Sequence, residues 1–183
     1  MENLVEAMRK KLICPCCRRR ITIAVNCLSC IFCQTDYPFQ DGIVHFFSDS
    51  NAQSGARETK SREYQLKYQQ VAAAKNYNSK ERRRLMRRTR REYRIIGDLL
   101  ARMGPMETVL DLPCGGGRLS PVVAKTAQLL IEADIAIGQL LYARQNCRLE
   151  IPRLWLRASA LQIPLADASV DGDPEVASEE ATI

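Results

Sequence analysis

The sequence predicts an α/β protein with a four-cysteine zinc ribbon, a basic helical linker and the first three parallel strands of a nucleotide-binding sheet. Three observations carry this prediction: two CxxC pairs near the N-terminus, one short and strongly basic stretch, and a glycine cluster directly after an apolar run. The predicted parts are the ribbon at 1–50, the linker at 51–104, the partial α/β domain at 105–172 and an acidic disordered tail at 173–183.

Six of the eight cysteines lie within one segment near the N-terminus. Two CxxC pairs stand out in it, Cys14 with Cys17 and Cys30 with Cys33. Each pair turns two thiolates toward one point, so the two pairs together supply the four sulfur ligands of a closed, structural zinc site. Reduced thiols without a metal are the weaker interpretation. The other two cysteines leave an alternative open, in which one replaces a ligand; these are Cys16 and Cys27.

The segment around the second pair, CIFCQTDYPFQDGIVHFF, resembles small zinc-ribbon modules that activate methyltransferases or are fused to their N-termini. The resemblance implies that Tyr37-Pro38 and Asp41-Gly42-Ile43 form the last ribbon strand and its turn. Between the two pairs, the β-branched residues of RRRITIAVN predict a further short strand. His45 falls in the apolar run after the turn, where a packed side chain is expected rather than a ligand.

The formal net charge of +6 comes from one short stretch, because residues 80–94 alone carry +7. Apolar residues at helical spacing predict a helix over 79–103, which Ser79 caps and Gly104-Pro105 ends. Its arginines are interpreted either as a solvated helix face or as a surface that binds RNA phosphates. They are Arg82, Arg83, Arg84, Arg87, Arg88, Arg90, Arg91 and Arg94.

Several classes of protein are excluded by composition. No apolar run approaches the roughly 20 residues that a membrane span needs, and the N-terminus lacks a secretory signal pattern. We therefore expect a cytoplasmic protein that does not bind membranes. The single histidine also excludes any mechanism that needs two imidazoles.

A strand, a glycine turn and a helix follow one another after the basic stretch. Residues 108–112 form a buried strand, the glycines come next, and LSPVVAKTA has a helical pattern. A second strand over 128–134 ends in an acidic residue about 20 positions after the glycines, where a doubly wound fold binds a ribose. The helix IGQLLYARQN and a third strand over 153–158 complete a βαβαβ pattern.

The segments VLDLPCGGGRL, EADIAIGQLLYARQN and ASALQIPLADASVDG resemble, in this order, the motifs of class I S-adenosyl-L-methionine-dependent methyltransferases, in particular the type 11 domain. The resemblance implies a Rossmann-like sheet, with Asp134 binding the ribose. Pro113 departs from the first motif, and Ser159 replaces an aspartate that contacts the adenine amino group. The implied cofactor contacts are Asp111, Cys114, Gly115, Gly117, Asp134, Ile135, Ser159, Ala160 and Leu161.

The resemblance implies methyl transfer from S-adenosyl-L-methionine to an unidentified acceptor. This chemistry needs little from the protein beyond alignment of an already activated donor, so no catalytic residue is assigned. Cys114 is expected to fill the turn as a small side chain rather than to react. The alternative is a non-catalytic binding module, in which the ribbon and the basic helix bind RNA or a protein partner.

The sheet that these motifs describe is incomplete in this sequence. Asp171 could begin a fourth strand, but GDPEVASEEATI follows it and has no strand pattern. Three interpretations are open: a truncated methyltransferase, a chain whose sheet is completed by a protein partner, and a remnant that keeps only the ribbon and the basic helix. We expect an open three-stranded sheet of this kind to expose an apolar edge and an apolar face.

Overall fold

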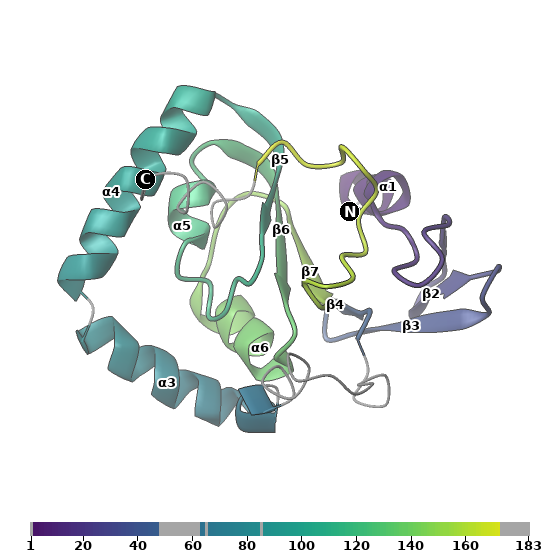
Figure 1. The fold of residues 1–183 in the computed structure, drawn as a ribbon, viewed down its shortest axis with the longest axis horizontal. Helices are drawn as coiled ribbons and strands as arrows, with labels where there is room; N and C mark the ends of the chain where they lie inside the picture. Colours follow the sequence, from purple (N-terminus) through teal and green to yellow (C-terminus); the bar gives the residue numbers. More distant parts are fainter. Residues whose placement is uncertain (1, 48–62, 65, 85, 173–183) are drawn as a thin grey trace.

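The computed structural model describes residues 2–47, 63–64, 66–84 and 86–172, and these form a seven-stranded sheet (Figure 1). Its parallel strands are covered on one face by helices and on the other by the N-terminal helix and the ribbon, whose own strands extend the sheet. The strand order is β1-β2-β3-β4-β7-β6-β5. The elements are α1 (Glu2–Lys11), β1 (Thr22–Ile23), β2 (Cys27–Cys30), β3 (Thr35–Gln40), β4 (Ile43–His45), α3 (Val71–Arg84), α4 (Met86–Met103), β5 (Met106–Asp111), α5 (Ser120–Val123), β6 (Ala127–Asp134), α6 (Ile137–Asn146) and β7 (Arg153–Arg157).

The central strands β5, β6 and β7 are parallel, as the βαβαβ pattern predicts. Helix α6 also has the predicted bounds. The helix after the glycines is much shorter than the predicted one, because α5 ends at Val123 and the chain turns there into β6. This turn is required because β6 begins directly beside the start of β5, where Met106 pairs with Ala127. The predicted fold class, an α/β protein with a partial Rossmann-like sheet, is confirmed.

The ribbon is an antiparallel meander of three strands followed by a tight turn into β4. Asp41 and Gly42 form that turn with positive φ values of 50° and 69°. Residues Thr22 and Ile23 form the short strand expected between the two cysteine pairs. The predicted final strand and its turn are therefore both present.

Strand β4 joins the ribbon to the α/β sheet, an arrangement that the sequence did not predict. It pairs in parallel with β7, with Ile43 opposite Trp155 and His45 opposite Arg157. An exposed edge was expected on the partial sheet, and at the edge formed by β7 this expectation is wrong, because β4 pairs there. Ile43 and Val44 are fully buried in this position, so the apolar run after the ribbon turn acts as an additional sheet strand.

The second face of the sheet is covered by the ribbon and α1. Leu12, Leu28 and Tyr37 belong to the same buried cluster as Ile131 and Leu156 of the central strands. The expected exposure of this face is also wrong, for a physical reason: the ribbon is too small to form a core alone and shares that of the sheet. Helix α1 was not predicted from the sequence, although its apolar residues recur at helical spacing.

The free side of β5 is met by the last described residues of the chain. The Asp171 backbone N–H donates to the Thr108 carbonyl at 2.8 Å, and its carboxylate accepts the Thr108 N–H at 2.8 Å. Gly172 forms a parallel bridge with Val109. These contacts form an isolated bridge beside β5 and not a strand, so the fourth strand that Asp171 could begin is not seen among the described residues. The acidic tail predicted at 173–183 lies outside the described residues.

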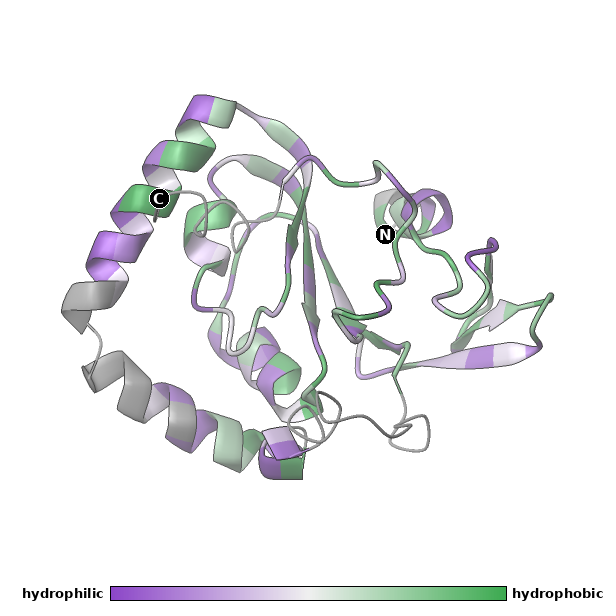
Figure 2. Cartoon of the chain, viewed as in Figure 1, coloured by the Kyte–Doolittle hydropathy of each residue, from purple (hydrophilic) through white to green (hydrophobic). Residues whose placement is uncertain are grey.

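The basic stretch spans two helices rather than one. The predicted start at Ser79 is wrong, because α3 already begins at Val71 in an alanine-rich segment that favours helix. The predicted end is confirmed, since α4 stops at Met103 and Gly104 follows with φ of 83°. Figure 2 shows apolar and polar residues interspersed along α4, and Ile96 and Leu100 are buried against the sheet.

The arginines of this stretch are only partly described. Arg90, Arg91 and Arg94 are exposed on α4. The remaining five side chains lie outside the described residues; these are Arg82, Arg83, Arg84, Arg87 and Arg88. Within the described ranges, no helix is both long and apolar enough for a membrane span.

Candidate metal centre and cofactor loop

The four predicted metal ligands converge at the ribbon's tip. The sulfur atoms of Cys14, Cys17, Cys30 and Cys33 all lie within 4.8 Å of one another. A tetrahedral zinc ion with Zn–S bonds of about 2.3 Å spaces its sulfurs about 3.8 Å apart. Four thiols at this spacing therefore fit a zinc ion, and all eight cysteines of the chain are free of disulfides.

Hydrogen bonds among the four thiols lower the pKa of two of them and raise the pKa of the other two. Burial raises the pKa of Cys14. Hydrogen bonds from the Tyr37 hydroxyl, 3.0 Å from the Cys14 sulfur, and from the backbone at Cys17 have a larger effect in the opposite direction, and the pKa falls to about 6. The pKa of Cys30 is also lowered, chiefly by the backbone N–H of Cys33. Against the backbone N–H of Arg19, burial and the neighbouring thiols raise the pKa of Cys17 to about 12, and the thiols of Cys14 and Cys30 raise the pKa of Cys33. Since a metal binds the thiolate, a cation at this cluster would have to displace the protons of Cys17 and Cys33.

The other ribbon candidates lie outside this group of four. Cys16 is exposed, with its sulfur 3.9 Å from the Tyr37 hydroxyl. The sulfur of Cys27 lies 3.4 Å from the Leu28 carbonyl oxygen. His45 is half-buried in β4, and burial lowers its pKa. The geometry therefore favours the set of ligands that the equal spacing of the two pairs predicts.

The glycine loop and the acidic end of β6 are joined by backbone hydrogen bonds. One oxygen of the Asp134 carboxylate accepts the Gly115 N–H at 2.9 Å, and the other accepts the Ala136 N–H at 2.8 Å. The Cys114 N–H donates to the Ala133 carbonyl at 2.9 Å. Asp134 therefore holds the loop against the carboxyl end of β6, and Asp111 is buried at the neighbouring end of β5.

The two predicted loop glycines have different surroundings. Gly115 has φ of +52°, and a Cβ built there would meet no atom within 4 Å. Gly117 has φ of +73°, but its Cβ would lie 3.2 Å from the side chains of Ala143 and Ser120. Gly117 thus permits close packing of the loop against α6, whereas the space beside Gly115 is open. Such a cradle fits a ligand that approaches the backbone closely.

Asp134 is fully buried, and its ionisation responds to that environment. Burial raises the pKa of its carboxyl group to about 6, although the N–H groups of Ala136 and Gly115 act in the opposite direction. The backbone N–H of Ile135 also lowers this pKa, so three N–H groups act on a carboxylate that has about four acceptor positions, and about one position remains for a ligand. Because the folded pKa lies above the ordinary value of 3.8, this carboxyl group stabilises the folded state most below about pH 4, and that contribution is lost by about pH 6.

Cys114 is packed into the core beneath the loop. It shares a buried cluster with Ile43 of the ribbon strand, Leu140 of α6 and Trp155 of β7. Burial raises the pKa of its thiol well above the ordinary value, so the thiol is protonated at neutral pH. The side chain fills space between the ribbon strand and the loop.

The segment after β7 lies beside the same end of the sheet. The Ala158 N–H donates to the Asp134 carbonyl at 3.1 Å. The Ser159 hydroxyl accepts the Leu161 N–H at 3.2 Å within a tight turn, and both Ala160 and Leu161 are exposed. The structure thus brings the predicted contacts of this segment near Asp134. The carbonyl of Ile135, another predicted contact, accepts a hydrogen bond from the Arg157 side chain at 3.3 Å.

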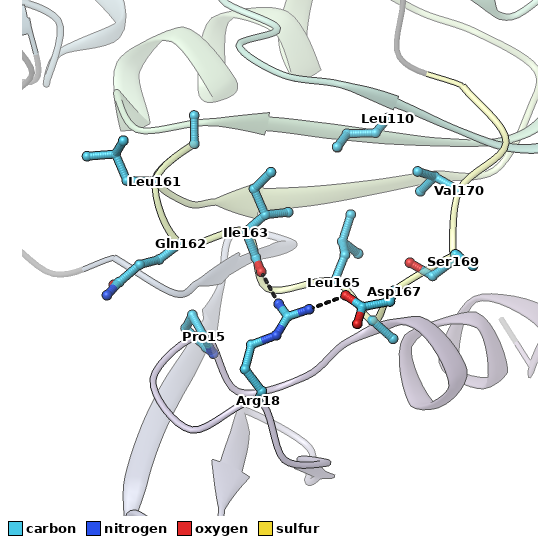
Figure 3. Close-up of a pocket in the computed structure, with 13 residues that line it drawn as sticks. Pro15, Arg18, Leu110, Leu161, Gln162, Ile163, Leu165, Asp167, Ser169 and Val170 are labelled. Atoms are coloured by element: carbon cyan, nitrogen blue, oxygen red, sulfur yellow. Dashed lines mark hydrogen bonds and ion pairs between the residues drawn. The ribbon is translucent and has the colours of Figure 1, made fainter.

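A cavity of about 460 Å³ lies between this segment and the ribbon (Figure 3). Ala160 and Leu161 line it, but none of the other predicted cofactor contacts does. Arg18 crosses its mouth, donating to the Ile163 carbonyl at 3.1 Å and to the Asp167 carboxylate at 2.6 Å. The cavity is therefore separate from the loop that Asp134 holds.

Two polar residues near the glycine loop were not anticipated from the sequence. Asn78 of α3 lies over the loop, since a Cβ on Gly116 would lie 2.5 Å from its side-chain nitrogen. Gln139 of α6 is fully buried and accepts a hydrogen bond from that nitrogen at 2.8 Å. Gln139 lies in the second sequence motif, but nothing local to the sequence indicates that Asn78 reaches the loop.

Comparison with known proteins gives remote likenesses only. No protein-family model and no curated protein sequence matches the chain. An apo-form mycolic acid cyclopropane synthase is 20% identical with a TM-score of 0.30, over 37% of this chain and 27% of that chain. A plantazolicin methyltransferase in complex with a monoazolic desmethylPZN analog and SAH is 17% identical with a TM-score of 0.37, over 62% of this chain and 47% of that chain. The same methyltransferase with SAH alone is 16% identical, with a TM-score of 0.35 and the same coverage. The chain thus spans less than half the length of each of these proteins.

Proposed function

We propose that this protein binds S-adenosyl-L-methionine at the glycine loop and transfers its methyl group to an acceptor. The observation that carries the proposal is the pairing of Gly115 with Asp134 across the ends of two parallel strands, with open space beside Gly115. This is the place where a doubly wound sheet binds nucleotides. The three sequence motifs, which resemble those of class I methyltransferases, support the identity of the cofactor.

The chain's own residues would bind and orient the cofactor. Asp134 would accept a hydrogen bond from a ribose hydroxyl, and Ile135 together with the turn at 159–161 would contact the adenine. The bound cofactor supplies an activated methyl group on a sulfonium, so alignment with the acceptor is the main task of the protein. The ribbon is proposed as a structural zinc module, because four thiolate ligands leave no open position for catalysis.

Binding of S-adenosylhomocysteine (SAH), the demethylated product, tests this proposal by titration calorimetry. We expect one site per chain at pH 7.5 and about tenfold weaker binding at pH 5. The sign follows from Asp134: its carboxylate accepts a ribose hydroxyl only when ionised, and a pKa of about 6 leaves roughly a tenth ionised at pH 5. The absence of detectable binding at millimolar SAH and pH 7.5 would contradict the proposed function.

RNA binding by the basic stretch is a second candidate function. The observation that favours it is that α4 buries its apolar face while Arg90, Arg91 and Arg94 are exposed on the same helix. Arginine side chains exposed in this way can contact the phosphates of single-stranded RNA. RNA is then a partner of a binding module, or the methyl acceptor itself.

Charge reversal tests this candidate. We expect Arg90→Glu, Arg91→Glu and Arg94→Glu together to weaken binding to a 20-nucleotide uridine RNA and to reduce the slope of log K against log salt by about 2. Fluorescence anisotropy at several salt concentrations measures both quantities. The matched control reverses three exposed basic residues outside α4, Arg9, Lys125 and Arg148, and changes the net charge equally. Equal losses in the two variants would show that net charge alone attracts the RNA.

A further inference from the structure

Gln139 is a buried polar side chain whose hydrogen-bonding capacity is only partly used. It lies in the first turn of α6 and is 0% exposed. Its side-chain oxygen accepts a hydrogen bond from Asn78, but its side-chain nitrogen has no partner among the residues that the structure describes. A buried amide group without a partner is destabilising, and native proteins rarely keep one without a role.

The orientation of this amide follows from its neighbours. The side-chain nitrogen of Asn78 donates to the Ala74 carbonyl at 2.9 Å, and a carbonyl can only accept. The group of Asn78 at this position is therefore its NH2, so the Gln139 atom 2.8 Å away must be the oxygen. The unpartnered atom of Gln139 is then an NH2 group with two donors to offer.

The surroundings of Gln139 link this amide to the glycine loop. Asn78 lies very close to Gly116, because a Cβ atom added to Gly116 would be 2.6 Å from the side-chain oxygen of Asn78. The neighbouring Gly138 N–H is already used, because it donates to the Tyr68 carbonyl at 2.9 Å. Helix α3, the first turn of α6 and the glycine loop therefore converge around one unused donor, the NH2 of Gln139.

We propose that the side-chain NH2 of Gln139 donates a hydrogen bond to the amino-acid carboxylate of bound S-adenosylmethionine, while Asn78 holds the amide in position. This inference rests on the proposed function. The carboxylate is the charged acceptor of the cofactor and carries no hydrogen to donate, so it matches a group that only donates; the ring nitrogens of adenine are weaker, uncharged acceptors. A ribose hydroxyl can instead donate to the carboxylate of Asp134, which accepts the Gly115 N–H of the same loop.

Two ligands separate this role from a general effect on the site. SAH carries the amino-acid group, whereas 5′-methylthioadenosine has the same adenosine but lacks that group. We expect Gln139→Leu, which keeps the approximate size and removes the amide, to weaken SAH binding about tenfold and to leave methylthioadenosine binding within twofold. Titration calorimetry measures both. Gln145→Leu is the matched control, because Gln145 is exposed on the same helix, and it should change neither affinity.

A second variant guards against misfolding of the first. Asn78→Ala leaves Gln139 in place but removes the group that orients it, and we expect severalfold weaker SAH binding with unchanged methylthioadenosine binding. Unchanged SAH binding in both variants, or equal losses for both ligands, would overturn the assignment of Gln139. If neither ligand binds the wild-type protein, the proposed function fails and this inference fails with it.

Discussion

Replacing Cys30 with serine is expected to reduce bound zinc from about one ion per chain to none and to unfold the ribbon. Cys30 is buried, and its sulfur lies 3.4 Å from that of Cys17, so serine removes a ligand from the centre of the cluster. Isolated zinc fingers gain about 10 kcal/mol from metal binding, and we expect the free energy of unfolding to fall by about 5 kcal/mol or more.

The effect should extend beyond the ribbon. Cys14 and Cys30 belong to the same buried cluster as Ile131 and Leu156, and β4 pairs with β7. Loss of the metal would therefore uncover one face and one edge of the central sheet. In thermal melting followed by circular dichroism, we therefore expect the ribbon and the sheet to lose their structure together, rather than the ribbon in a separate transition.

Cys27→Ser and Cys16→Ser are the matched controls for this prediction. Both cysteines lie outside the group of four, so both variants should keep about one zinc ion and nearly the wild-type melting temperature. Zinc released by a mercurial reagent and detected with a colorimetric chelator gives the stoichiometry. A Cys27→Ser protein without zinc, or a Cys30→Ser protein with a full complement, would assign the ligands differently.

Gly115→Ala is expected to weaken SAH binding by at least about 100-fold with a small effect on stability. The added Cβ meets no protein atom, so it occupies only the space that we assign to the cofactor. The positive φ of 52° costs about 1–2 kcal/mol for alanine. Titration calorimetry gives the affinity and thermal melting gives the stability.

Gly104→Ala isolates the backbone strain from the effect on the ligand. Gly104 also has a positive φ, of 83°, and a Cβ there likewise meets nothing within 4 Å, but it lies at the end of α4. The two variants should therefore lose similar stability, while only Gly115→Ala loses SAH binding. Wild-type affinity in Gly115→Ala would remove the open space beside Gly115 as support for the proposed site.

The parts that could be predicted from sequence depend on local spacing. The two CxxC pairs bring their own thiols together within a few residues, and the structure then places all four within 4.8 Å. The apolar runs before and after the glycines predicted β5 and β6, and Gly104 marked the end of α4. In each case neighbouring residues determine the conformation.

The errors arose where packing between distant segments overrides the local pattern. Ser79 has the residue type of a helix cap, yet it lies inside α3. The segment IVH after the ribbon turn is too short to indicate a partner, and its parallel pairing with β7 joins residues more than 100 positions apart. The contact of Asn78 with the glycine loop likewise has no signal in the sequence.

By itself, the sequence determined the cysteine cluster, the strand–loop–strand unit and the concentration of charge in one stretch, because each depends on residues close together in the chain. Only the tertiary structure decided that the ribbon completes one edge and one face of the sheet, that Asp134 holds the glycine loop, and that Gln139 keeps an unused donor beside it. The physical reason is that burial and hydrogen-bond satisfaction are set by what packs against a residue, and those neighbours come from distant parts of the chain.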